Sequence, residues 1–150
     1  MYSKQQASLI RKNFWTSFGQ YMKPVLSAEG APVNWLNYKT GVKDIFFRMD
    51  ADHQHASIAI ELAHADPLQR EQQYGQLVQM KTIFIETIEE EWEWQNNVAD
   101  EHGKQICRIG TVINGVNIFK TEDWPAIISF LKPRMIRLDS FWYLVKDVFL

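Results

Sequence analysis

The sequence predicts an α+β layered fold in a single domain that spans residues 1–150. Apolar residues recur every three or four positions near both ends of the chain, and they alternate in short segments between. Turn signals separate these segments. The expected order is a helix, a three-strand antiparallel meander, a long helix, a β-hairpin and a kinked C-terminal helix or helix pair.

The first half of the chain predicts a helix followed by three strands. Residues 3–22 carry apolar side chains at helical spacing; Ser3 can cap the helix and Pro24 stops it. Residues 33–39, 42–49 and 56–62 alternate in polarity, as strands do. The turn 40-TG-41 separates the first two strands, and the polar stretch 50-DADHQH-55 connects the second to the third.

The second half predicts a long helix, a hairpin and the C-terminal helices. Asp66 and Pro67 open a helix that runs to about residue 91, and residues 92–94 follow as a short extended piece. The pair Asn114-Gly115 between residues 106–113 and 116–119 predicts a type I′ hairpin. Residues 121–132 and 134–149 are predicted to be helical, with Pro133 kinking or ending the first of them.

Composition limits the classes of function. No apolar run is long enough to span a bilayer, no secretory signal is evident, and the only cysteine is Cys107, so we expect a cytoplasmic protein. The net charge of −2 is unevenly distributed, because residues 66–101 carry nine acids and two bases. The rest of the chain carries fourteen bases and nine acids, which is less basic than a dedicated DNA-binding domain.

The stretch 50-DADHQH-55 raises the question of a metal site. Asp50, Asp52, His53 and His55 are of types that zinc or manganese accepts. A connection between two strands must also be polar because it stays in contact with water. We favour a solvated loop here and keep the metal site as the alternative.

A second alternative is a nuclease of the restriction-endonuclease type. Such enzymes place an Asp on one strand and Glu-x-Lys on the next, and the carboxylates hold Mg²⁺ or Mn²⁺. Asp44 or Asp50 could supply the Asp, with Glu61 on the following strand. The position of the lysine is occupied by Ala63, so a catalytically dead relative fits better than an active enzyme.

The aromatic content predicts a binding surface. Aromatic side chains interleaved with Lys and Arg suit single-stranded nucleic acid or a protein interface. The candidate residues are Lys39, Lys43, Arg48, Lys132, Arg134, Arg137, Trp35 and Trp124. The bases of 132-KPRM-135 can instead form ion pairs with the acidic stretch 86–93, within the fold or in a dimer. We slightly prefer that interpretation.

Several phrases resemble a known family. They are 14-FWTSFGQYMKP-24, 33-VNWLNYKTGVKDIFFRMDAD-52, 56-ASIAIEL-62, 123-DWPAIISFLKPRM-135 and 141-FWYLVKDVF-149. Together they are similar to the bacterial domain of unknown function numbered 4268, some members of which adjoin nuclease-type domains. The resemblance implies a bacterial α/β-type domain associated with nucleic-acid enzymes, and it implies no catalytic residue.

These observations lead to the hypothesis of a non-catalytic binding or accessory domain that needs no cofactor. Its partner would be another protein, a second copy of the chain or a nucleic acid, and not a membrane. The alternatives are the Mg²⁺-dependent nuclease, or its dead relative, and a structural dimerisation module.

Overall fold

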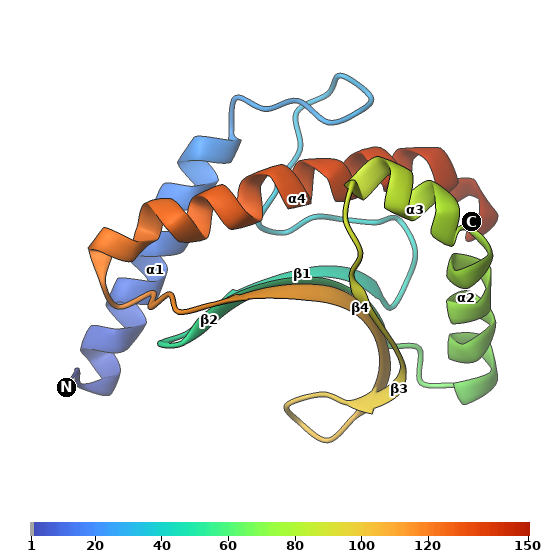
Figure 1. Ribbon diagram of the computed structural model, residues 1–150, viewed down its shortest axis with the longest axis horizontal. Helices are drawn as coiled ribbons and strands as arrows, with labels where there is room; N and C mark the ends of the chain where they lie inside the picture. Colours follow the sequence, from blue (N-terminus) through green and yellow to red (C-terminus); the bar gives the residue numbers. More distant parts are fainter. Residues whose placement is uncertain (1) are drawn as a thin grey trace.

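The α+β class is confirmed by the computed structural model, which describes residues 2–150 (Figure 1). The strands form one antiparallel sheet in the order β1-β2-β4-β3. In chain order the elements are α1 (Lys4–Met22), β1 (Ile45–Ala51), β2 (His55–Leu62), α2 (Pro67–Gln79), α3 (Lys81–Ile88), β3 (Glu93–Ala99), β4 (Gln105–Asn114) and α4 (Trp124–Val145). Short 3₁₀ turns, Thr121–Asp123 and Lys146–Val148, flank α4.

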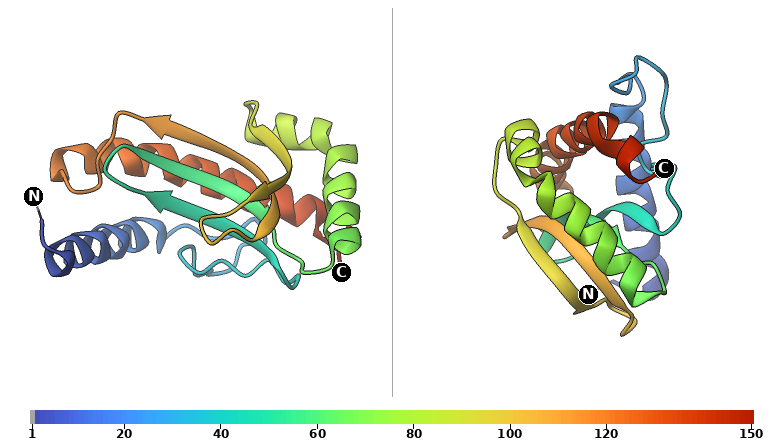
Figure 2. Two further views of the ribbon diagram at one scale, coloured as in Figure 1. Left: turned by 90° about the horizontal axis from the view of Figure 1, so that it is seen from below. Right: turned by 90° about the vertical axis from the view of Figure 1, so that its right-hand side faces the viewer.

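The helices lie on one side of a strongly bent sheet (Figure 1, Figure 2). The long helix α4 crosses the convex face, α3 lies beside α4, and α2 stands at the end where β4 curls away. Ile58, Ile60 and Leu62 of β2 are fully buried in the core with Leu131 and Leu138 of α4. An antiparallel sheet needs only one covered face, so the concave face is left without a helix.

The predicted caps of the first two helices are confirmed. Ser3 accepts a hydrogen bond from the backbone of Gln6, whose side chain accepts one from Ser3 N–H in return. Asp66 Oδ1 accepts from Leu68 N–H at 3.0 Å, and Pro67 is the first helical residue. Helix caps depend only on residues that are close in the sequence, which is why they can be predicted from it.

The predicted single helix over residues 66–91 is instead two helices. The chain leaves the helical conformation at Met80, with φ −101° and ψ 15°, and resumes it at Lys81. The break lets α2 pack on the end of the sheet while α3 turns to pack along α4 (Figure 1). By contrast α4 continues through Pro133, where Arg134 donates a side-chain hydrogen bond to the Phe130 carbonyl at 2.9 Å.

The predicted strand at residues 33–39 is wrong, because this segment is an irregular loop packed against α4. Trp35 is buried and donates from Nε1 to the Val25 carbonyl at 3.0 Å. The Tyr38 hydroxyl donates to the buried carboxylate of Asp139 at 2.5 Å. The alternating apolar residues therefore anchor a loop, and the three-strand meander of the nuclease interpretation is reduced to the hairpin β1–β2.

The predicted hairpin at Asn114-Gly115 is also wrong. Gly115 has a positive φ of 79°, as a turn requires, but β4 ends at Asn114 and residues 116–119 form no strand. Gly115 N–H donates to the Gln54 carbonyl and Ile118 N–H to the Asp52 carbonyl, because Val116 and Ile118 are drawn into the core. The hairpin partner of β4 is β3.

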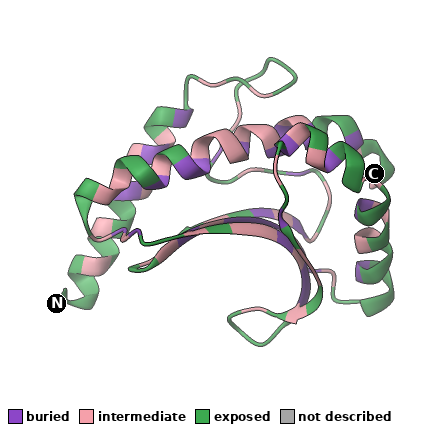
Figure 3. Cartoon of the chain, in the orientation of Figure 1, coloured by how far each residue is buried: buried purple, intermediate pink, exposed green. Residues whose placement is uncertain are grey.

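Buried residues are concentrated in the core elements and exposed residues in the loops (Figure 3). Buried residues recur along α4, whereas the loop after α1 and the loop between β3 and β4 are largely exposed. None of the helices in the described part of the chain combines the length and the apolar character needed to cross a membrane.

Candidate functional site on the concave face of the sheet

The strand register places three rows of side chains across the concave face. Residues directly opposite one another in antiparallel strands point to the same face. The rows are Phe46–Glu61–Arg108–Gln95, Arg48–Ala59–Gly110–Glu93 and Asp50–Ser57–Val112. Except for Phe46, these residues and the β3–β4 loop line a cleft of about 620 Å³, which we call the concave cleft.

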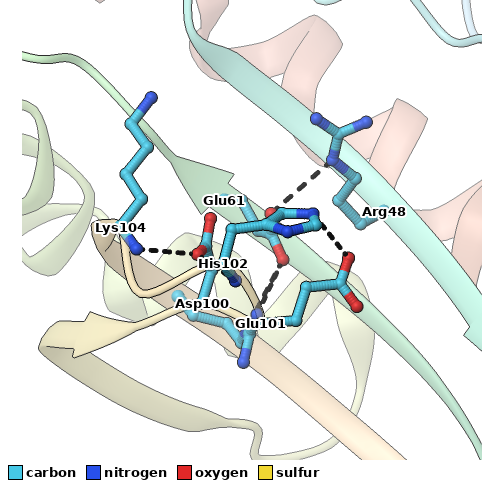
Figure 4. Close-up of polar contacts among 7 residues, drawn as sticks. Arg48, Glu61, Asp100, Glu101, His102 and Lys104 are labelled. Atoms are coloured by element: carbon cyan, nitrogen blue, oxygen red, sulfur yellow. Dashed lines mark hydrogen bonds and ion pairs between the residues drawn. The ribbon is translucent and has the colours of Figure 1, made fainter.

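A carboxylate between two arginines lies at the centre of the cleft (Figure 4). Glu61 Oε2 accepts from Arg108 Nη2 at 2.9 Å, and Glu61 Oε1 lies 3.6 Å from Arg48 Nε. The Glu61 side chain is only 17% exposed, and each of its oxygens lies beside one of these arginines. We call Arg48, Glu61 and Arg108 the central triad.

The floor of the cleft is made of small residues. A Cβ atom on Gly110 would lie 2.9 Å from Ala59 Cβ and 3.0 Å from the Ile58 carbonyl oxygen. Only glycine fits at this position, since real Cβ atoms do not approach other atoms so closely. Glycine within a strand often marks a bend or a site where another backbone approaches closely.

The rim of the cleft is acidic. Asp50, Glu93, Asp100 and Glu101 all line it, and among the described residues none of them forms an ion pair with a Lys or Arg. Asp100 accepts hydrogen bonds from the backbone N–H groups of Lys104 and His102 at 2.9 and 2.8 Å, which lower the pKa of its carboxyl and keep it charged. With five carboxylates and two arginines the lining carries a net charge of −3 when His55 is neutral.

The structure holds the nuclease candidate Asp50 apart from Glu61. Asp50 pairs with Ser57, four residues from Glu61 along β2, which corresponds to about 13 Å. Asp44 lies in the turn before β1 with a positive φ of 65°, and its carbonyl accepts from Ala63 N–H. Within residues 2–150 no group of three or more His, Cys, Asp or Glu side chains is placed to hold a metal ion.

Of the metal candidates in 50-DADHQH-55, Asp52 and His53 lie in the tight turn between β1 and β2, Asp50 lies in β1 and His55 begins β2. Asp52 Oδ1 accepts from the backbone N–H groups of Gln54 and His55 at 2.8 and 2.9 Å, and it lies 3.3 Å from His55 Nδ1. Burial opposes ionisation of Asp52, but these hydrogen bonds outweigh it and lower the pKa of the carboxyl. The carboxylate thus closes the turn, while His53 is exposed.

The residues of the predicted binding surface lie in several places. Arg48 is in the concave cleft, and Lys39 and Lys43 are exposed on the loop before β1. Trp35 is buried, and Trp124 donates from Nε1 to the Ile118 carbonyl at 2.6 Å, so both indoles have structural partners.

The predicted residues of α4 face the acidic end of α3. Arg134 Nε donates to Glu90 Oε1 at 2.7 Å and Arg134 Nη2 to Oε2 at 3.0 Å. Arg137 Nη2 lies 3.3 Å from Glu89 Oε2, and Lys132 is half-buried on the same helix. The intramolecular interpretation of 132-KPRM-135 thus holds for Arg134, whereas none of the ion pairs among residues 2–150 includes Lys132.

Sequence reasoning missed Arg108 and, apart from Asp50, the acidic rim. The signal for Arg108 was available, because it alternates with the buried Cys107 and Ile109 in a predicted strand. The carboxylates of Asp100 and Glu101 come from a loop whose position depends on the unpredicted pairing of β3 with β4.

Comparison with known proteins bears on the family and not on the cleft. No curated protein and no solved structure matches the chain. The family described as "Domain of unknown function (DUF4268)" matches residues 10–146, nearly the whole chain. Its match covers both strands of the β1–β2 hairpin, the β3–β4 hairpin and α4, so the chain belongs to the DUF4268 family.

Proposed function

We propose that the domain is a non-catalytic binding module that holds a basic, extended segment of a partner polypeptide in the concave cleft. The observation that carries this proposal is the charge of the cleft. Arg48 and Arg108 share Glu61, whereas among the described residues none of the four rim carboxylates forms an ion pair with a Lys or Arg. An uncovered acidic surface attracts cationic partners and repels polyanions.

The shape and chemistry of the cleft favour a peptide over a small molecule. Small-molecule pockets are enclosed and mostly apolar, with few polar groups. The concave cleft is lined mainly by charged and polar side chains along three open rows. Its small floor residues, Ser57, Ala59 and Gly110, would let an extended backbone lie close to the sheet.

The state of Glu61 supports a non-catalytic role. A carboxylate that binds Mg²⁺ needs free oxygen lone pairs and a second acid nearby. Glu61 instead pairs with two arginines. The rim carboxylates form no ion pair with a Lys or Arg of the described residues, so they remain available to the cations of a partner.

The proposal is tested by fluorescence anisotropy with a labelled peptide of alternating lysine and glycine, at low and moderate salt. We expect saturable binding to the natural chain. The double substitution Glu93→Gln, Glu101→Gln should weaken binding about tenfold, since each rim charge contributes on the order of 0.5–1 kcal/mol. Both residues are exposed, so the variant should fold normally.

The matched control is the double substitution Glu86→Gln, Glu91→Gln. It removes the same charge from exposed positions outside the cleft and should leave the affinity unchanged. Equal weakening by both pairs would mean attraction to an acidic protein in general, and no saturable binding would refute the proposal.

A second candidate is the binding of single-stranded nucleic acid near the start of α1. Here Tyr2, Phe119 and Trp124 line a hollow of about 300 Å³, and the Arg11 guanidinium lies 5.2 Å from the Phe119 ring centroid. Among residues 2–150, the ion pairs include none of Lys4, Arg11, Lys12 and Lys120. Aromatic faces beside unpaired cations suit stacked bases and phosphates.

Labelled single-stranded DNA and RNA in the same assay test this candidate. Binding that falls steeply with salt and is lost in Arg11→Gln, Lys12→Gln would support it. Binding that survives this double substitution would place any nucleic-acid site elsewhere and refute this one.

A further inference from the structure

Arg70 is a buried arginine without a carboxylate partner. It lies in the first turn of α2 and is only 7% exposed. Its Nη1 donates to the His64 carbonyl at 2.8 Å and its Nη2 to Asn97 Oδ1 at 3.3 Å. Both partners are neutral oxygens, and none of the ion pairs among residues 2–150 includes Arg70.

A guanidinium remains charged at any ordinary pH, so burial cannot be relieved by loss of a proton. Burying a charge without a counter-charge is strongly unfavourable. A negative charge from outside the chain would therefore be stabilised beside Arg70.

A cavity of about 110 Å³ adjoins Arg70 between the start of α2 and β3. It is lined by Pro67, Arg70, Glu71, Asn96, Asn97 and Cys107. The two asparagines form the bulge of β3, where the pairing register shifts between Gln95 and Val98 and Asn97 has a φ of 68°.

The asparagine side chains supply further donors. Asn97 Oδ1 accepts from Arg70, and Asn96 Oδ1 accepts from the Cys107 thiol at 3.3 Å. Because the oxygen end of each amide is engaged, its Nδ2 group is the end left to donate, and both residues line the cavity. A buried cation and amide donors together make a site for a small anion.

We propose that a tetrahedral oxyanion, phosphate or sulfate, binds in this cavity with Arg70 as its counter-charge. Glu71 is the one acidic side chain in the lining, and it opposes anion binding. Because the Glu71 side chain is exposed, its charge lowers the affinity for an anion but does not occupy the cavity. This gives the site two neighbouring positions whose substitutions have opposite expected effects.

The test is an NMR titration of the ¹⁵N-labelled full chain with inorganic phosphate and then sulfate, at constant ionic strength. The reporters are the Arg70 Nε–H signal and the side-chain amides of Asn96 and Asn97. We expect saturable shifts in the natural chain, a loss of affinity of about tenfold or more in Arg70→Gln, and tighter binding in Glu71→Gln. O-phosphoserine as a third titrant distinguishes a free oxyanion from a phosphoryl group on another chain.

Shifts that do not saturate, or that persist unchanged in Arg70→Gln, would overturn the proposal. Should Arg70→Gln fail to fold, Glu71→Gln decides, because removal of an exposed charge does not threaten the fold. An affinity for phosphate that is the same in Glu71→Gln and in the natural chain would then refute the site.

Discussion

Gly110 lies in the middle of β4, where Ala59 is its neighbour across the strand pair. The two positions together determine how closely β2 and β4 approach on the concave face. A methyl group on Gly110 would meet both the Ala59 side chain and the backbone of Ile58. The absence of a side chain at this one position therefore permits the bend and leaves the floor of the cleft open.

We expect Gly110→Ala to lower the free energy of unfolding by about 1–3 kcal/mol, as overpacking of tight positions does. Ala59→Gly in the same chain should restore part of the loss, because it removes the methyl group that the new one meets. Denaturant unfolding measures both changes. The control is Gly75→Ala in α2, where an added Cβ meets no other atom within 4 Å. This substitution should stabilise the helix slightly. Equal effects at the two glycines would refute this account of Gly110.

Among the elements, α3 and α4 are joined by the bidentate contact between Glu90 and Arg134. Burial opposes ionisation of Glu90, but hydrogen bonds from Arg134 and Trp92 outweigh it and lower the pKa of the carboxyl. A lowered pKa in the folded state means that the contact stabilises the fold above the usual glutamate pKa of 4.5. The contribution is lost as the pH falls through the lowered value.

We expect Arg134→Met to cost about 1 kcal/mol of unfolding free energy at neutral pH, and less as the pH falls below the lowered pKa of Glu90. Urea unfolding at several pH values measures the difference from the natural chain. Arg137→Met is the control, since its partner Glu89 is 67% exposed and such pairs contribute little. A cost for Arg134→Met that does not change with pH would contradict the ionic origin.

The elements also show what the sequence could and could not predict. Helix caps and the alternation in β1 and β2 depend on near neighbours, and the structure has these elements with ends shifted by a few residues. The alternation in residues 33–39 was misleading because Trp35 and Tyr38 anchor a loop through partners at Val25 and Asp139. The turn signal at Gly115 is real, but the next residues are drawn into the core instead of pairing.

The candidate site was harder to predict than the fold. Glu61 and Arg48 were recognised as candidates, yet their mutual contact depends on the register between β1 and β2. Arg108 and Glu93 join them only through β4 and β3, which follow two helices later in the chain. Local patterns carry no information on such distant pairing.

For the whole molecule, one core connects all the elements. Fully buried side chains of α1, β2, α3 and α4, such as Phe14, Ile60, Phe84 and Leu138, belong to a single cluster. We therefore expect one cooperative unfolding transition over the full chain. Tryptophan fluorescence and far-ultraviolet circular dichroism should give the same midpoint in urea. Two separate midpoints would show that α1 or the β3–β4 hairpin unfolds independently.

The shape of the concave cleft and its charge depend on different residues. The depth of the cleft is determined by Ala59 and Gly110, whereas its sign of charge is determined by side chains at the rim such as Glu93 and Glu101. These two sets share no residue, and Glu93 and Glu101 are exposed. Shape and polarity thus depend on different residues in this scaffold: exchange of rim side chains would change the charge of the cleft and leave its curvature unchanged.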